Sequence, residues 1–91
     1  MSRKIWYCCP NFLIETQEIG GELHVHCKVN KWSPSVLKRL YVEFIMLRID
    51  VLAMGYTEMF SVSPNPKFCE LFGAKSIGTY ENYEVMRWEL E

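Results

Sequence analysis

Two histidines separated by a single residue are the feature of this sequence that most readily suggests chemistry. His24 and His26 alternate with Leu23 and Val25, and alternate residues of a strand share one face. Two imidazoles on one face could supply two ligands to zinc or copper, but a closed zinc site needs about four ligands. The pattern therefore favours two polar-face residues over a metal site.

The four cysteines are the other reactive side chains. Cys8 and Cys9 are neighbours, while Cys27 and Cys69 stand far apart, and this spacing matches no disulfide framework. A metal site at the histidines would need Cys8, Cys9 or Cys69 to be brought there by folding alone. We therefore expect no bound metal and reduced thiols, as in proteins of a reducing compartment.

Length and composition indicate one compact domain. The 91 residues are 49% hydrophobic and 23% charged, which is an ordinary globular composition. A chain this short has room for one core, so a single domain is expected over residues 1–91. The net charge of −1 supplies no global attraction for nucleic acid or for an anionic membrane. Neither is expected as a partner.

No segment predicts export or membrane insertion. The apolar run near the amino end stops at Pro10, which makes it too short for a signal peptide. Arg48 and Asp50 interrupt the longest apolar stretch before it reaches the roughly 18 residues of a spanning helix. The sequence therefore predicts a soluble, cytoplasmic protein.

The first third of the sequence predicts β-strands. Two β-prone segments, 5–9 and 12–16, are separated by Pro10. The Gly20–Gly21 pair marks a turn, after which apolar and polar residues alternate. Residues 12–29 are therefore predicted to form a hairpin.

A long helix is predicted over residues 34–54. Ser33 can cap it, Pro34 suits its first position, and Gly55 can adopt the left-handed conformation that ends helices. At about 100° per residue, one broad apolar face should pack on the sheet. That face comprises Leu37, Leu40, Tyr41, Phe44, Leu47, Val51 and Leu52.

The same helix carries a second apolar stripe on its far side. A helix that is apolar nearly all round is usually covered on both sides, so this stripe is either core beneath the amino-terminal segment or an interface with another protein. Arg48 projects from the first face, where a salt bridge to Glu70 or Glu84, or a stem packed on apolar surface, is favoured over an acidic partner or ligand phosphate. The stripe consists of Val42, Met46, Ile49 and Ala53.

The remainder predicts a strand, a short helix and two more strands. Residues 56–62 have strand character, and the short helix has Asn65 as its cap and closes at Gly73. Two strands, 75–79 and 83–90, complete the chain. The sequence thus predicts an α+β fold with one long and one short helix, in the order β-β-β-α-β-α-β-β.

From residue 23 onward the chain resembles the carboxy-terminal half of the GCN5-related N-acetyltransferase (GNAT) superfamily. The most specific match is segment 65–74, with Asn at the start of a short helix and Gly at its close, and 83–90 is similar to the family's last strand. The resemblance implies a mixed sheet in which two splayed parallel strands, here 22–30 and 56–62, hold acyl-CoA. The chain is also similar to truncated acetyltransferase-like proteins of tailed bacteriophages, which suggests a phage origin.

An active enzyme of this family would give roles to several residues. Glu22 or His26 would be the general base, and Cys69 would replace the family's Tyr general acid. The loop 29–35 would bind the pyrophosphate of acetyl-CoA at the start of the long helix. The residues implied in coenzyme binding are Lys31, Ser33, Ser35 and Asn65.

Departures from the family pattern favour a protein that is not an enzyme. The loop 29–35 contains no glycine, Trp32 is bulky, and Pro34 has no N–H, so a pyrophosphate cannot approach the backbone closely. Few residues precede the histidine strand, so the amino-terminal helices that help to form the family's acceptor site are missing.

The sequence therefore predicts a small non-catalytic, GNAT-like protein-binding module. Its partner would be a second copy or a larger protein, in the host cytoplasm if the origin is viral, and no cofactor is expected. An acetyl-CoA-dependent acyltransferase is the alternative, and metal-dependent assembly through His24 and His26 is a third hypothesis. The expected contact residues are Trp32, Val42, Met46 and Ile49.

Overall fold

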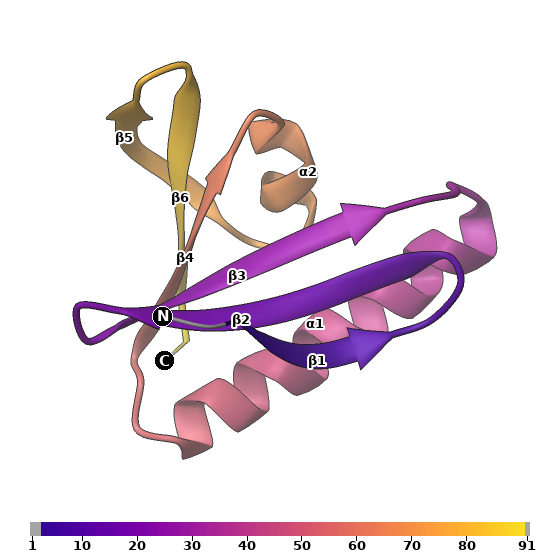
Figure 1. The fold of residues 1–91 in the computed structure, drawn as a ribbon, viewed down its shortest axis with the longest axis horizontal. Coiled ribbons are helices and arrows are strands. Elements are labelled where there is room, and N and C mark those ends of the chain that lie inside the picture. Colours follow the sequence, from indigo (N-terminus) through magenta and orange to yellow (C-terminus); the bar gives the residue numbers. More distant parts are fainter. Residues whose placement is uncertain (1–2, 91) are drawn as a thin grey trace.

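The computed structural model describes residues 3–90 and contains a six-stranded sheet and two helices (Figure 1). The predicted α+β class, the mixed sheet and the order β-β-β-α-β-α-β-β are confirmed. Residues 1, 2 and 91, which the predictions for the amino end and for the domain include, lie outside the described part.

The amino-terminal third forms three antiparallel strands. These are β1 (Lys4–Cys8), β2 (Phe12–Ile19) and β3 (Glu22–Val29), and each pairs with the next. The predicted hairpin is confirmed, and its two-residue turn suits the Gly20–Gly21 pair because both residues have positive φ, 58° and 84°. An extra residue in β1, Trp6, interrupts the register with β2, and such a bulge lets neighbouring side chains pack toward the same core.

The long helix α1 (Pro34–Ala53) begins where the sequence predicts. Ser33 Oγ accepts a hydrogen bond from Val36 N at 3.2 Å, which satisfies one of the free donors at the helix start. The helix ends one residue before the predicted end, with Met54 as its C-cap and Gly55 at φ 101°. The residues that mark its two ends, Ser33, Pro34 and Gly55, therefore identify this helix correctly.

The buried face of α1 is narrower than predicted and is rotated slightly. Leu40, Phe44, Leu47 and Val51 are buried as expected, and Leu37 is half-buried. The prediction is wrong for two residues at the margins of the face, which remain 40% and 38% exposed because they lie beyond the edge of the sheet contact. These residues are Tyr41 and Leu52.

Two buried residues of α1 were not predicted. Val36 is buried in the first turn, and Glu43 is only 5% exposed. Arg39 Nε lies 3.1 Å from Glu43 Oε2, one turn away, and its guanidinium also lies over the Tyr7 ring at 5.1 Å. The ion pair offsets the cost of burying the Glu43 carboxylate. A pattern of apolar residues cannot predict such a buried charged residue.

The second half of the chain completes the sheet in the order β1-β2-β3-β4-β6-β5. Strand β4 starts two residues later than predicted, because Tyr56 N still donates to Val51 O at the end of α1. The short helix is confirmed, with Asn65 Oδ1 accepting from Phe68 N at 3.4 Å. The elements are β4 (Glu58–Ser63), α2 (Pro66–Leu71), β5 (Lys75–Tyr80) and β6 (Tyr83–Glu89).

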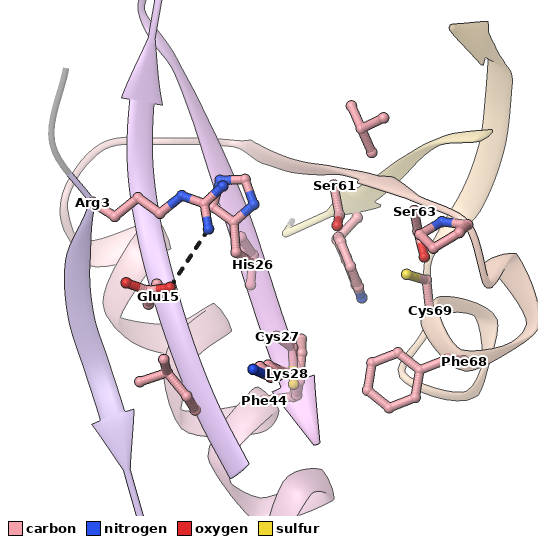
Figure 2. A pocket seen from close by; sticks show the side chains of 15 residues that line it. Arg3, Glu15, His26, Cys27, Lys28, Phe44, Ser61, Ser63, Phe68 and Cys69 are labelled. Atoms are coloured by element: carbon pink, nitrogen blue, oxygen red, sulfur yellow. Dashed lines mark ion pairs between the residues drawn. The ribbon is translucent and has the colours of Figure 1, made fainter. Parts of the chain in front are cut away.

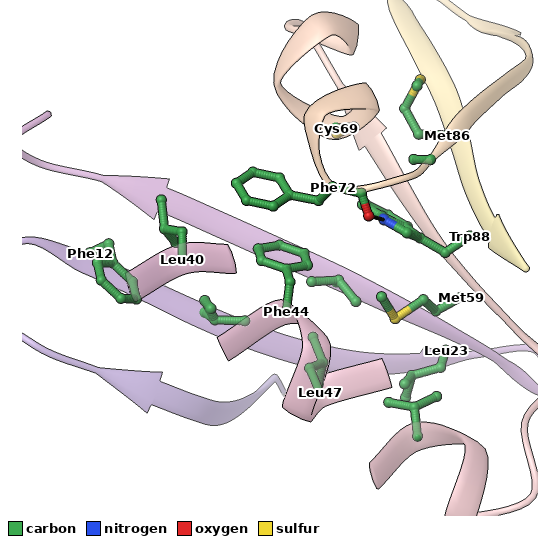
Figure 3. Close-up of a cluster of buried hydrophobic side chains, with 14 of the residues drawn as sticks. Phe12, Leu23, Leu40, Phe44, Leu47, Met59, Cys69, Phe72, Met86 and Trp88 are labelled. Carbon is green, nitrogen blue, oxygen red and sulfur yellow. Dashed lines mark hydrogen bonds between the residues drawn. The ribbon is translucent and has the colours of Figure 1, made fainter. Parts of the chain in front are cut away.

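An aromatic cluster connects the two helices with the sheet (Figure 3). Phe44 of α1 stacks on Phe72 with ring centroids 4.6 Å apart, and on Trp88 of β6 at 5.9 Å. Trp88 Nε1 donates to Phe72 O at 3.0 Å, which satisfies the buried indole. Both helices thus contribute to one core, and His24 and His26 lie on the other face of the sheet, opposite the buried Leu23 and Val25.

Candidate functional site

The two parallel strands in the middle of the sheet separate and leave a cleft. Strands β3 and β4 are paired at one position only, His24 with Phe60, and they diverge toward their carboxyl ends (Figure 1). A cleft of about 280 Å³ lies between them. The splayed parallel pair expected at 22–30 and 56–62 is therefore present, with the bounds of β3 and β4.

The cleft has two unlike walls (Figure 2). His26, Cys27 and Lys28 line it from β3, and Ser61 and Ser63 line it from β4. Side chains of both helices and of β6 form its apolar part: Phe44, Phe68 and Trp88. Of the predicted catalytic residues, the cleft brings together His26 and Cys69.

His26 meets the protonation requirement of a general base. Its Nε2 donates to Gln17 Oε1 at 3.0 Å. Burial is the main cause that lowers the pKa of His26 below 6.5, and the positive charge of Arg3 lowers it further, which the negative charge of Glu15 partly opposes. The imidazole is therefore mostly neutral at pH 7, the state in which it can accept a proton.

Glu22, the other candidate base, lies away from the cleft. It is exposed at the first residue of β3, and its Oε1 lies 3.7 Å from His24 Nε2. It does not line the cleft, which lies beside residues 25–28 of that strand. The structure therefore separates Glu22 from His26 and Cys69.

The two cysteines of the cleft are protonated at neutral pH. Burial raises the pKa of Cys69, which outweighs the lowering by hydrogen bonds with Ser63 and Ser61. Burial, and then the neighbouring Cys69, raises the pKa of Cys27 to about 12. All four cysteines are free. Cys69 is consequently a weak proton donor, and neither thiol carries charge into the cleft.

Several backbone donors around the start of α1 already have acceptors within the protein. Asn30 N and Lys31 N both donate to Asn11 O, at 2.7 and 3.4 Å. Val36 N donates to the Ser33 side chain, and Leu37 N to Ser33 O at 3.0 Å. Pro34 has no N–H. The coenzyme-binding candidate Ser35 uses its hydroxyl in a 3.1 Å hydrogen bond with Ser33 Oγ, and Lys31 is exposed.

Trp32 lies beside the cleft, in contact with α2. Its ring meets Phe68 edge-on, with centroids 5.5 Å apart. Together with Asn65 it lines a smaller hollow of about 190 Å³, which shares Cys27 and Phe68 with the cleft. Trp32 therefore packs against α2, whereas the other predicted contact residues lie on α1.

The far side of α1 carries an exposed apolar stripe. Val42, Met46 and Ile49 are 48%, 51% and 62% exposed, and Ala53 is exposed too. Ile45, at 56%, belongs to the same surface and was not predicted. The interpretation of the stripe as core beneath the amino-terminal segment is wrong, because that segment forms β1 within the sheet.

Arg48 contacts neither of the acids predicted for it. Its Nη2 donates to Glu89 O at 3.2 Å. The predicted salt bridge to Glu70 or Glu84 is therefore wrong, because a backbone carbonyl at the end of β6 lies within reach instead.

Within residues 3–90, no group of three or more histidines, cysteines, aspartates or glutamates could hold a metal ion. His24 and His26 consequently find no third ligand in the part of the chain that the structure describes. No helix in this part is both long enough and apolar enough to cross a membrane.

Several residues of the cleft were not expected as site residues. Cys27 and Lys28 directly follow the predicted His26, and Arg3 contributes from the chain before β1. Ser61 and Ser63 alternate along β4, a pattern that could have indicated a shared polar face. Arg3 could not have been found from spacing, because it reaches the cleft only through the pairing of β1 with β2.

No protein-family model, curated protein or solved structure matches this chain. The geometry of the cleft and of the helix surface therefore carries the functional argument.

Proposed function

We propose that this chain is a non-catalytic protein-binding module on a GNAT-like scaffold, and that it binds through the outward face of α1. The observation that carries this proposal is the exposed stripe of Val42, Met46 and Ile49, extended by Ile45. Full burial of one such side chain stabilises by about 1.5–3 kcal/mol, so completing the burial of these half-exposed groups contributes about 1 kcal/mol each. A partner surface would gain this free energy.

The occupied donors at the start of α1 support the absence of catalysis. A diphosphate is held at a helix start by unpaired backbone N–H groups. Here Asn30, Lys31, Val36 and Leu37 already donate within the protein, and Trp32 fills the approach beside Phe68. The family's coenzyme would have to break these contacts, at a cost for each lost hydrogen bond.

We infer that a second copy of this chain is the partner that best fits the exposed stripe of α1. Two α1 helices packed antiparallel would place the stripe against its own equivalent, as a two-fold interface requires. The last turn of α1 has no basic residue, and Lys38 near its start is exposed. Antiparallel packing would bring Lys38 to the carbonyl end of the other helix, where a cation is favoured. A phage-encoded chain could offer the same face to a host protein.

Sedimentation velocity tests this proposal. We expect the wild type to sediment as a dimer, and the double variant Met46→Glu/Ile49→Glu to sediment as a monomer with an unchanged circular dichroism spectrum. The matched control is Ile5→Glu/Ile77→Glu, which charges two exposed isoleucines elsewhere, 65% and 48% exposed, and should leave the dimer intact. A strictly monomeric wild type that also recovers no stripe-dependent partner from a lysate would contradict the proposal.

An acetyl-CoA-dependent acyltransferase is the second candidate. The observation in its favour is the cleft between β3 and β4, which both His26 and Cys69 line. Calorimetry with acetyl-CoA separates the two candidates. Micromolar binding would favour the enzyme, whereas no heat at millimolar ligand would end this alternative.

A further inference from the structure

The cleft between β3 and β4 combines an apolar interior with a cationic rim. Its apolar lining includes Val25, Phe44 and Trp88, and Phe68 contributes from α2. The volume, about 280 Å³, lies just below the range of about 300–1,000 Å³ that is usual for ligand pockets. The cleft therefore suits a small ligand that is mainly apolar.

The interior of the cleft is unfavourable for a charged group of a ligand. Cys27, whose pKa is raised to about 12, and Cys69, whose pKa is raised by burial, are neutral thiols at pH 7. The hydroxyls of Ser61 and Ser63 are engaged with the Cys69 thiol. An ionised group placed between these walls would lose its hydration without gaining an opposite charge. Any charged end of a ligand must stay at the rim.

The rim attracts an anion. Arg3 and Lys28 both line it, and Glu15, the one acid among the described residues that line the cleft, lies 3.6 Å from Arg3 Nη1. This leaves one positive charge in excess, because His26 is mostly neutral at pH 7 with its lowered pKa. Both basic side chains are accessible, since the Arg3 side chain is 50% exposed and Lys28 is exposed.

The apolar space continues beyond the cleft. The hollow of about 190 Å³ beside Trp32 shares Cys27, Ser63 and Phe68 with it. A straight chain that enters at the rim can thus extend past Cys27 and Phe68 toward Trp32. A branched or bulky ligand would meet β3 on one side and β4 on the other.

We propose that this cleft binds a straight-chain monocarboxylate, of the medium-chain fatty-acid class, with its carboxylate at Arg3 and Lys28 and its alkyl chain between β3 and β4. This site is distinct from the α1 stripe and does not depend on the proposed function. It requires no backbone donors at the start of α1, where Asn30, Lys31 and Val36 already donate within the protein. The ligand is bound without a chemical step.

Titration of the labelled protein with decanoate, followed by NMR amide shifts, tests this site. We expect a dissociation constant no weaker than about 1 mM, with shifts concentrated at Cys27, Lys28 and Ser61. Acetate, which lacks the chain, and decylammonium, which reverses the charge, should each bind at least about fivefold more weakly. Shifts confined to the α1 stripe, or none at about 10 mM decanoate, would overturn the proposal.

Variants at the rim test the contribution of charge. Arg3→Gln and Lys28→Gln should each weaken decanoate binding by about threefold to fivefold, as expected for partly exposed charges. Lys75→Gln removes a basic side chain that does not line the cleft and should leave binding unchanged. These surface substitutions leave the core intact, so a misfolded variant does not obscure the result. Equal binding of decanoate by all three variants would refute recognition of the carboxylate by this rim.

Discussion

Trp6 and Trp88 both have a buried indole nitrogen, but in the described part of the chain only that of Trp88 has a hydrogen-bond acceptor. Trp88 Nε1 donates to Phe72 O, whereas Trp6 Nε1 is buried and finds no acceptor among residues 3–90. We expect Trp88→Phe to lower the free energy of unfolding by about 2–4 kcal/mol, because it leaves a buried carbonyl unpaired and removes core volume. Trp6→Phe should cost at least about 1 kcal/mol less. Equal losses in chemical denaturation would contradict this difference.

His26 should make the stability of the protein depend on pH. Burial and then the positive charge of Arg3 lower its pKa below 6.5, so the unfolded chain binds a proton at a higher pH than the folded protein does. Stability is therefore highest above pH 6.5 and falls as the pH drops through 6.5 toward the folded pKa. His26→Gln should show a smaller loss between about pH 7.5 and 5.5 in guanidinium unfolding. If the stability of His26→Gln fell with pH as much as that of the wild type, a group other than His26 would be responsible.

The resemblance to a family pointed to part of the cleft. It gave His26 and Cys69 roles as base and acid of an active enzyme, and both side chains line the cleft. Glu22 was proposed from its neighbourhood in sequence, but four residues of extended strand carry it away from His26, at about 3.3 Å per residue. Arg3 was missed because only the pairing of β1 with β2 brings it near.

The cap of α1 offers a test at the scale of a single element. Ser33 Oγ accepts from Val36 N, so Ser33→Ala should lower the free energy of unfolding by about 1 kcal/mol. Ser35→Ala is the matched control, since Ser35 lies inside the helix, where Ala is favourable, and should change stability by less than about 0.5 kcal/mol. Urea denaturation measures both. A larger loss for Ser35→Ala would mean that the hydroxyl pair at Ser33 matters more than the cap.

The residues at helix ends predicted where the helices begin and end better than the apolar pattern predicted which side of α1 is buried. Cap residues, prolines and glycines mark α1 and α2, and their bounds agree with the structure within one residue. The side of α1 that meets the sheet was less certain, because apolar residues occur all round it. Tyr41 was assigned to the core and Val36 was not, since the true orientation depends on the sheet's position. Glu43 is buried only because Arg39 compensates its charge.

At the scale of the whole molecule, the order of the strands depends on contacts that no local pattern contains. Strands β3 and β4 become parallel neighbours because α1 connects them as a crossover, and β6 then pairs with β4 ahead of β5. The expectation of a splayed pair came from resemblance to a family, not from periodicity. The divergence after His24 and Phe60 creates the cleft, which is therefore a property of the assembled sheet.

The divergence of β3 and β4 predicts that fast and slow amide hydrogen exchange alternate along β3. In a two-residue hairpin the pair that flanks the turn, Ile19 and Glu22, is hydrogen-bonded, so every second amide after it points to β2. The amides of His26 and Lys28 therefore face β2, whereas that of Cys27 faces the cleft, beyond the single pairing with β4. We expect Cys27 to exchange at least about tenfold faster than both neighbours in native-state NMR exchange. Equal protection of the three amides would mean that β3 and β4 close in solution, and the cleft that both ligand hypotheses require would be absent.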